Sequence, residues 1–177
     1  MDTSNWDLKI KRKAIIELAE LGYSIGVVAS ILGMRSSLAA RMLTEEFEIY
    51  NMFNRELSVK EIEKHGPFSI LSQIKSYSDI CEITIFYKIY LSICKEQNDN
   101  QPNPFVVALA FHNYFKGARD RRVVPLFVHV NQAYYFVSQI HQGIITVSEC
   151  PICKNIVVYP NGFKKPDCPL CRLKQAA

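Results

Sequence analysis

The stretch Cys150-Pro-Ile-Cys153, followed after fourteen residues by Cys168-Pro-Leu-Cys171, decides how the C-terminal part of the chain folds. Two Cys-x-x-Cys pairs at this separation match a site in which four thiolates bind one zinc ion. Each pair bends the backbone so that two sulfur atoms face the same metal, and the two bends together complete a tetrahedron. Two disulfides, or free thiols, are the alternatives to a metal site.

The residues between the two pairs are typical of a zinc ribbon. Residues 154–159 predict a short strand, and Pro160-Asn161-Gly162 predicts a tight turn. Pro151 and Pro169 occupy the same place in both pairs and help to fix the two bends, because proline fixes its own φ angle. Four cysteines leave no open coordination position, so we expect one structural Zn²⁺ rather than a catalytic one.

Length and composition indicate a globular protein with one sizeable core and small appendages. The chain has 177 residues, and none of its apolar stretches reaches the length that spans a bilayer. Its first residues lack the basic segment and apolar run of a secretory signal. We therefore expect a cytoplasmic protein with no membrane partner, whose cysteines bind metal rather than form disulfides.

The basic residues are concentrated in the second half of the chain. Residues 116–177 contain nine Lys or Arg and three Asp or Glu, a net charge of +6, whereas the whole chain carries +4 and the first 115 residues therefore carry −2. A basic region around a zinc ribbon favours a polyanionic partner such as nucleic acid. An acidic patch on a partner protein is the alternative.

Residues 1–50 predict a helical unit of the helix-turn-helix kind. Apolar residues recur at helical spacing over residues 7–21, a second helix follows the N-cap Ser24 as far as Leu32, and a third covers residues 35–48. Ala29 and Gly33 have the spacing of this motif, because a small residue lets two helices touch and a glycine can adopt φ > 0 in the turn. An ordinary helical hairpin is the alternative.

The third of these helices is the candidate recognition helix. Arginine and serine at the start of such a helix suit base edges and phosphates in a major groove. The candidate DNA contacts there are Arg35, Ser36, Ser37 and Arg41. The same helix contains Glu45, Glu46 and Glu48, which would repel phosphates if they faced DNA.

Residues 51–145 predict a helical middle domain. Ser58 and Glu61 form a capping box for a short helix over residues 58–64, and another can cover residues 68–74. Residues 78–95 are apolar on all sides and predict a central helix buried on every side, with a pair of strands as the alternative. Helices over residues 105–114 and 126–140 follow, separated by a basic corner at residues 116–122. A strand over residues 144–147 leads into the ribbon, residues 146–177, so the predicted fold is mainly α with a small C-terminal four-cysteine zinc ribbon.

The sequence lacks the motifs of common enzymes, so we expect no catalytic activity. It contains no phosphate-binding glycine loop, no GxSxG and no HExxH. A metalloenzyme would need an open metal position, which four thiolates do not offer. We expect instead that basic side chains bind DNA phosphates, and the candidates are Arg119, Arg121, Arg122, Lys164, Lys165 and Arg172. A protein-interaction adaptor without direct DNA binding is the alternative function.

Taken together, these features resemble the FlhC family, the larger subunit of the flagellar master transcriptional activator of bacteria. The resemblance rests on Leu21-Gly22, on the segments YKIYL (87–91) and AYYFVSQI (133–140), and on SECPIC (148–153) and DCPLC (167–171). It is most specific from about residue 131 to residue 172. The chain ends six residues after Cys171 and has Val130-Asn131-Gln132 where an arginine is expected, which favours a diverged member.

The resemblance implies a cytoplasmic transcriptional activator that binds promoter DNA together with a small helical FlhD-like subunit and acts with RNA polymerase. In the flagellar case four small and two large subunits form a heterohexamer. The family's zinc ligands correspond to Cys150, Cys153, Cys168 and Cys171. The target operons would be flagellar or, as for the members on conjugative plasmids and integrative elements, conjugative-transfer operons.

Overall fold

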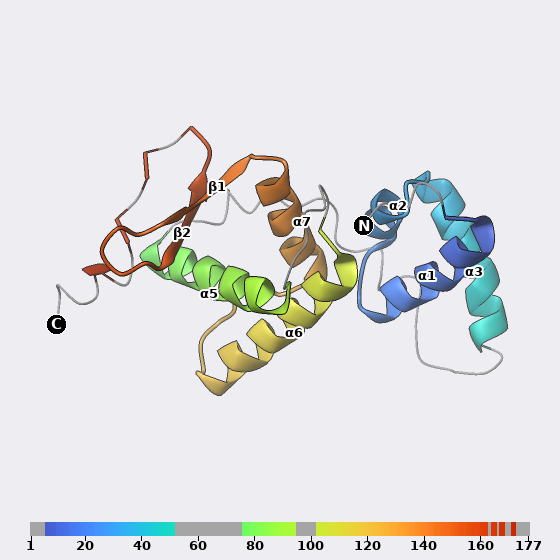
Figure 1. Ribbon diagram of the computed structural model, residues 1–177. Coiled ribbons are helices and arrows are strands. Elements are labelled where there is room, and N and C mark those ends of the chain that lie inside the picture. The colour runs from blue at the N-terminus through green and yellow to red at the C-terminus, as the bar shows by residue number, and fades with distance from the viewer. Residues whose placement is uncertain are drawn as a thin grey trace. The chain divides into compact units, whose positions relative to one another are not determined.

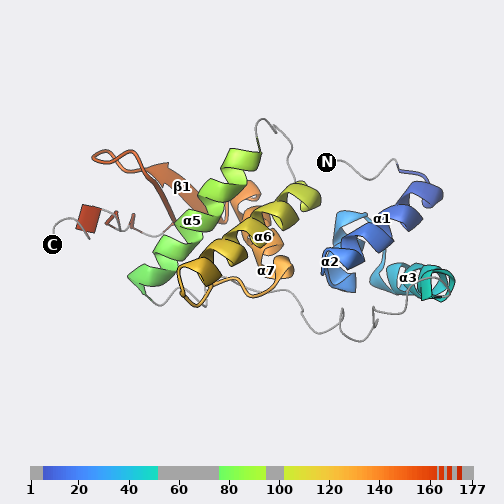
Figure 2. The same cartoon turned by 90° about the horizontal axis from the view of Figure 1, so that it is seen from below.

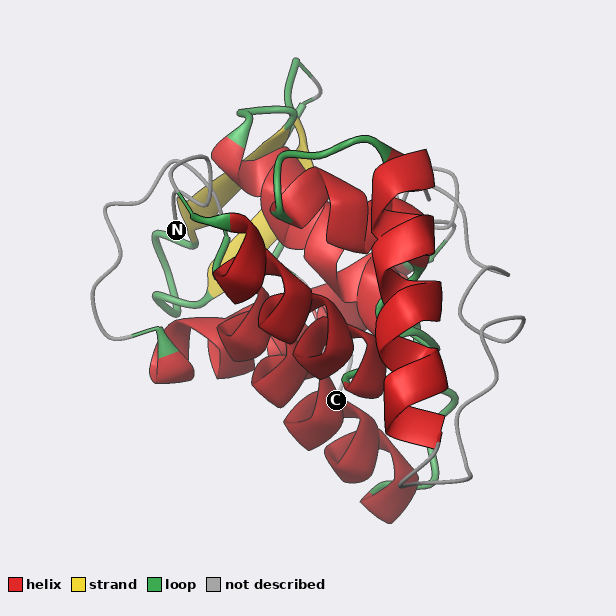
Figure 3. Ribbon diagram, turned by 90° about the vertical axis from the view of Figure 1, so that its right-hand side faces the viewer, coloured by secondary structure: helices red, strands yellow, loops and turns green. Residues whose placement is uncertain are grey.

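The structure is a computed structural model that describes residues 6–51, 76–94, 102–162, 164–165, 167–168 and 171–172. Over these residues the chain forms six α-helices and one two-stranded sheet, so the fold is mainly α, as predicted (Figure 3). The helices predicted over residues 58–64 and 68–74 lie outside the described residues. The chain divides into two compact units: residues 1–68 with 129–131, and residues 69–128 with 132–177.

The first unit contains three helices: α1 (Leu8–Glu20), α2 (Ile25–Ile31) and α3 (Ser36–Asn51), shown in Figure 1. The Asp7 side chain caps α1 by accepting a hydrogen bond from the backbone N–H of Ile10 at 2.8 Å. The apolar faces of the three helices meet in a small core, whose fully buried large side chains are Ile15, Leu18, Tyr23, Leu32, Met42 and Leu43.

The turn between α2 and α3 has the predicted helix-turn-helix character. The chain turns by 108° between the two helices, which lies in the range of that motif. Gly33 has φ +59°. Ala29 is only 2% exposed, and its carbonyl accepts the backbone N–H of Met34 across the turn at 3.0 Å. Ser24 occupies the predicted N-cap position of α2, although its side chain forms no capping hydrogen bond.

The second unit contains α5 (Tyr77–Ile93), α6 (Pro104–Asp120) and α7 (Val130–His141) from its third residue on, since residues 130 and 131 belong to the first unit. A capping box formed by Ser76 and Asp79 starts α5, and α5 and α6 pack side by side (Figure 2). Aromatic rings fill the core of this unit. The Phe127 ring lies 4.7 Å from that of Phe86 and 5.4 Å from that of Phe136, measured between ring centroids.

Helix α7 begins at Val130 rather than at the predicted Leu126, because the preceding residues are held by other contacts. The backbone N–H of Leu126 donates to the Tyr114 hydroxyl at 2.9 Å, and that of Val128 donates to the Gln132 side chain at 2.8 Å. Phe127 lies fully buried between them. These residues therefore form an ordered connection that a helix could not replace.

Two further predictions for the helical middle part need correction. Helix α6 extends to Asp120, so Lys116 and Arg119 of the predicted basic corner lie on its last turns. Residues 77–93 form the predicted helix, α5, and not a pair of strands. However, Leu91 is 39% exposed, and Lys88 and Ser92 are exposed too. The helix is therefore not buried on every side as predicted.

The sheet is an antiparallel hairpin of β1 (Ile145–Glu149) and β2 (Ile156–Pro160). Its register pairs Ile145 with Pro160 and Glu149 with Ile156, so that residues 150–155 form the turn that contains the first cysteine pair. Strand β2 packs against α5 in the same compact unit (Figure 1). Among the described helices, none is by itself both long and apolar enough to cross a membrane; α2 and the start of α3 meet the criteria of length and composition only as a bent pair.

Candidate functional site

The four cysteines of the two Cys-x-x-Cys pairs come together at one end of the hairpin. All four sulfur atoms lie within 4.8 Å of one another. The Sγ atoms of Cys150 and Cys171 are 3.7 Å apart, and those of Cys153 and Cys168 are 3.4 Å apart. Sulfur atoms bound tetrahedrally at about 2.3 Å from a metal lie about 3.8 Å from each other. The cluster therefore fits a single metal ion, and its four members are free thiols rather than disulfides.

The first cysteine pair is shaped by a tight turn at the end of β1. The backbone N–H of Lys154 donates to the Cys150 carbonyl at 2.9 Å, and that of Cys150 donates to the Asn155 carbonyl at 2.7 Å. Lys154 adopts φ +58°, which turns the chain back into β2. The side chains of Val157 and Tyr159 on β2 pack against the cysteines and provide an apolar wall for the centre.

Hydrogen bonds prepare the first pair to bind a cation. The backbone N–H and the side-chain amide of Asn155 donate to the Cys153 sulfur and lower the pKa of Cys153 to about 6. The backbone N–H of Cys153 is the main cause of the lowered pKa of Cys150. A hydrogen bond to the Cys153 sulfur, with loss of solvation, raises the pKa of Cys171 to about 12. A metal ion must displace the Cys171 proton, because metals bind thiolates.

The centre is connected to α5 by residues that sequence reasoning missed. Lys88 on α5 donates a hydrogen bond to the side-chain oxygen of Asn155, whose nitrogen in turn faces Cys153. A small cavity of about 70 Å³ lies at the same junction, lined by residues of α5 and the ribbon that include Cys81 and Cys168. One signal was available: Lys88 is the single charged residue between positions 83 and 94.

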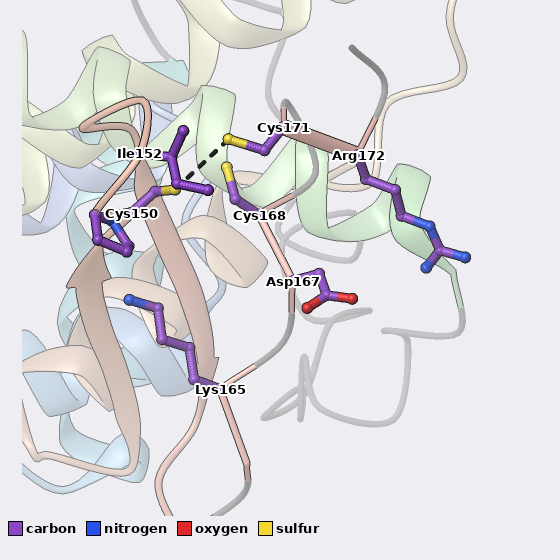
Figure 4. A pocket seen from close by; sticks show the side chains of 8 residues that line it. Cys150, Ile152, Lys165, Asp167, Cys168, Cys171 and Arg172 are labelled. Atoms are coloured by element: carbon purple, nitrogen blue, oxygen red, sulfur yellow. Dashed lines mark hydrogen bonds between the residues drawn. The ribbon is translucent and has the colours of Figure 1, made fainter. Parts of the chain in front are cut away.

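A larger open hollow of about 580 Å³ lies next to the centre (Figure 4). Three of the four cysteines, Cys150, Cys168 and Cys171, line it together with Pro151, Ile152, Lys165, Asp167 and Arg172. Lys165 donates a hydrogen bond to the Glu149 carbonyl at 2.6 Å, which ties the loop after β2 back to β1. Arg172 extends away from the sulfur atoms (Figure 4). Two of the predicted DNA contacts, Lys165 and Arg172, line this hollow beside the cysteines, and Lys164 precedes Lys165 in the chain. All three side chains are exposed.

The other three predicted contacts of this unit lie at the end of α6. Arg119, Arg121 and Arg122 are exposed there. Arg121 forms an ion pair at 3.5 Å with Glu82, a carboxylate on α5 whose side chain is only 9% exposed. The Tyr114 hydroxyl donates to Glu82 at 2.8 Å, and burial together with this hydrogen bond raises the pKa of Tyr114.

The first unit contains the remaining predicted contacts. Arg35, Ser36 and Ser37 are exposed at the start of α3, and Arg41 is exposed but forms an ion pair at 3.5 Å with Glu45. Arg12 on α1 binds Glu45 at 2.9 Å and Glu46 at 3.0 Å. Glu45 and Glu46, two of the three acids expected to repel phosphates, therefore form ion pairs with Arg12. The side chain of the third, Glu48, lies outside the described residues.

The chain was compared with models of protein families and with curated proteins. No family model matches it, and no curated protein does either.

Proposed function

We propose that the protein is the DNA-binding subunit of a heteromeric bacterial transcriptional activator of the FlhC type. The observation that carries the proposal is the four-cysteine cluster beside a hollow lined by the exposed cations Lys165 and Arg172, with the exposed Lys164 next to Lys165 in the chain. Together with Lys154, they give residues 146–172 four basic side chains against two acidic ones. Such a rigid basic surface suits the phosphate backbone of duplex DNA.

The metal in this proposal is one structural Zn²⁺ held by Cys150, Cys153, Cys168 and Cys171. Zinc prefers a tetrahedral shell of thiolates, and four cysteines fill that shell completely. When bound, the ion supplies folding energy rather than chemistry, since a short hairpin buries little apolar surface of its own. The chain's contribution is to lower the pKa values of Cys150 and Cys153 through hydrogen bonds and to place Lys165 and Arg172 beside the cysteines.

The exposed start of α3 would contribute the sequence-reading contacts. Arg35, Ser36 and Ser37 lie at the end of a helix-turn-helix turn, where such motifs face base edges. The ion pairs of Arg12 with Glu45 and Glu46 reduce the repulsion that these acids would exert on phosphates. The proposed partners are promoter DNA, an FlhD-like helical subunit and RNA polymerase, and the proposed targets are flagellar or conjugative-transfer operons.

The experiment is a salt titration of DNA binding with the full zinc-loaded chain, with and without the FlhD-like subunit. Each phosphate contact that is lost makes the plot of log affinity against log salt less steep by about one unit. We expect Lys164→Gln/Lys165→Gln to weaken binding to all sequences and to flatten this slope. The control, Lys9→Gln/Lys13→Gln, removes the same charge from exposed positions on α1. An unchanged slope for the ribbon variant, or equal effects of both variants, would remove these lysines from the DNA contact.

One observation favours a second function, a protein-interaction adaptor. Ile152, between the first two cysteines, is 77% exposed and lines the open hollow beside them, so the hollow offers an apolar contact as well as charged ones. The two functions differ in retention on a column of non-specific DNA at low salt. A chain that passes through such a column, alone and with its partner, would be an adaptor.

A further inference from the structure

The end of α6 differs from the ends of three other described helices that share its geometry. In α1, α2, α6 and α7 the chain closes with the same pair of backbone hydrogen bonds, the Schellman motif. The residue after the cap adopts a left-handed conformation in each case: Gly22 at +87°, Gly33 at +59°, Gly143 at +70°, but Arg122 at +56°. An L side chain is disfavoured there, because its Cβ approaches the backbone, whereas glycine adopts this conformation freely.

Among the described residues, the Arg122 side chain has no partner that would account for its presence. It is exposed, and within the part of the chain that the structure describes neither Arg122 nor Arg119 forms an ion pair. Asp120 is the one acid among residues 116–124. At this position the chain therefore has an unfavourable backbone conformation for its residue type, and it presents a positive charge to solvent.

The turn is also held rigidly from inside the unit. Arg121 pairs with the buried Glu82, and Glu82 accepts the hydroxyl proton of Tyr114 in a hydrogen bond. The same hydroxyl accepts the backbone N–H of Leu126. Residues 121–126 are thus fixed at both ends, so a ligand that binds the turn does not have to order it.

We propose that the turn at residues 119–122 is a preformed clamp for the phosphodiester backbone of duplex nucleic acid. Arg119 and Arg122 contact the phosphates, and Arg121 is a positioning residue that Glu82 keeps engaged. Arginine suits this task because its planar guanidinium can donate two parallel hydrogen bonds to one phosphate. This proposal rests on the proposed DNA-binding function and assigns it a second contact surface, separate in sequence from the ribbon.

The test is the substitution Arg122→Gly, which separates folding from binding. Glycine removes the charge and the conformational strain together, so we expect a melting temperature equal to that of the wild type or about 2–4 °C higher. We expect the affinity for a labelled duplex of mixed sequence, measured by fluorescence anisotropy on the full zinc-loaded chain, to fall about threefold to tenfold. The salt slope should flatten by about one unit. Arg122→Ala should lose the same affinity without the gain in melting temperature.

Lys13→Gln, the loss of one exposed charge on α1, is the matched control and should leave binding near the wild-type value. If the wild type binds the duplex and Arg122→Gly binds it with the same affinity and slope, the clamp is overturned while the DNA-binding function stands. If the wild type does not bind, either alone or with the FlhD-like subunit, both are overturned. A lower melting temperature of Arg122→Gly would overturn the strain argument. Equal losses toward DNA and toward polyglutamate would overturn the assignment to phosphates, because the turn would then bind any polyanion.

Discussion

At the scale of single residues, the Tyr114 hydroxyl joins segments that are far apart in the chain. It donates to Glu82 on α5 and accepts from the backbone of Leu126 after α6. We expect Tyr114→Phe to lower the free energy of unfolding by about 1–3 kcal/mol, because it leaves a buried carboxylate and a backbone N–H without this partner. Urea denaturation measures the change. Tyr135→Phe is the control, since the Tyr135 hydroxyl forms no hydrogen bond with described residues; a similar loss there would contradict the assigned role.

This network also shows where prediction from single residues ends. The four cysteines could be found from spacing alone, because Cys-x-x-Cys pairs act locally and their chemistry demands a common metal. Glu82 and Tyr114 are 32 positions apart, and nothing in the local pattern around either residue indicates the other. The role of Arg121 in pairing with Glu82 could therefore not be predicted, although its exposure at a basic corner could.

At the scale of secondary-structure elements, the helix-turn-helix unit and the hairpin could be predicted from local signals. Ala29 and Gly33 determine the bend between α2 and α3, and the apolar run in α5 indicates a helix of the correct length. The start of α7 could not be predicted, because the chain before it is held by Tyr114 and by the aromatic core. The spacing of apolar residues indicates which face of a segment is buried. It does not reveal a distant side chain, such as Tyr114, that binds the backbone N–H groups of that segment.

The connection between the hairpin and α5 predicts how the centre binds metal. Asn155 donates to Cys153 and accepts from Lys88, and such outer partners typically change metal affinity about 10–100-fold. We expect Asn155→Ala to weaken zinc affinity about tenfold, measured by competition with a chromophoric chelator. A second readout, the thiolate-to-metal absorption of the Co²⁺-loaded protein, should also change. An unchanged zinc affinity would contradict this role of the side chain and would show that the backbone N–H of residue 155 alone is enough to orient the Cys153 sulfur.

The pKa values of the cysteines set the direction of the pH dependence of metal binding. Because the pKa of Cys171 is raised to about 12, its proton is still present near neutral pH and must leave when the metal binds. Each displaced proton weakens apparent affinity about tenfold per unit of falling pH. We expect at least this slope between about pH 8 and about pH 6.5, with a steeper one near pH 6, where Cys153 also becomes protonated. A pH-independent affinity over this range would contradict the raised pKa of Cys171.

At the scale of the whole molecule, buried tyrosines predict an alkaline limit of stability. Burial raises the pKa of Tyr134 to about 12, and it also raises those of Tyr90 and Tyr114. Below the ordinary tyrosine pKa of about 10, both folded and unfolded chains keep these protons, so the contribution to stability is complete. Above it the unfolded chain releases protons first, and stability must fall as pH rises.

We therefore expect the urea midpoint to decrease steadily from about pH 9.5 to about pH 11.5. Absorbance at 295 nm should show that part of the tyrosines ionise only as the protein unfolds. Tyr134→Phe should make the decrease less steep, which separates this effect from the titration of lysines. A wild-type midpoint that stays constant over this interval would refute the prediction.

The seating of the hairpin on α5 has a mechanical consequence. Strand β2 packs along α5, and Lys88 holds Asn155 beside Cys153. Because of these contacts, the ribbon cannot move independently of α5. A polymer that pulls on the basic side chains around the cysteines exerts a torque on α5. From there the load reaches Glu82 and Phe86, which belong to the same helix. A force applied at the cysteine end of the ribbon is thus transmitted through α5 to the aromatic core of the unit.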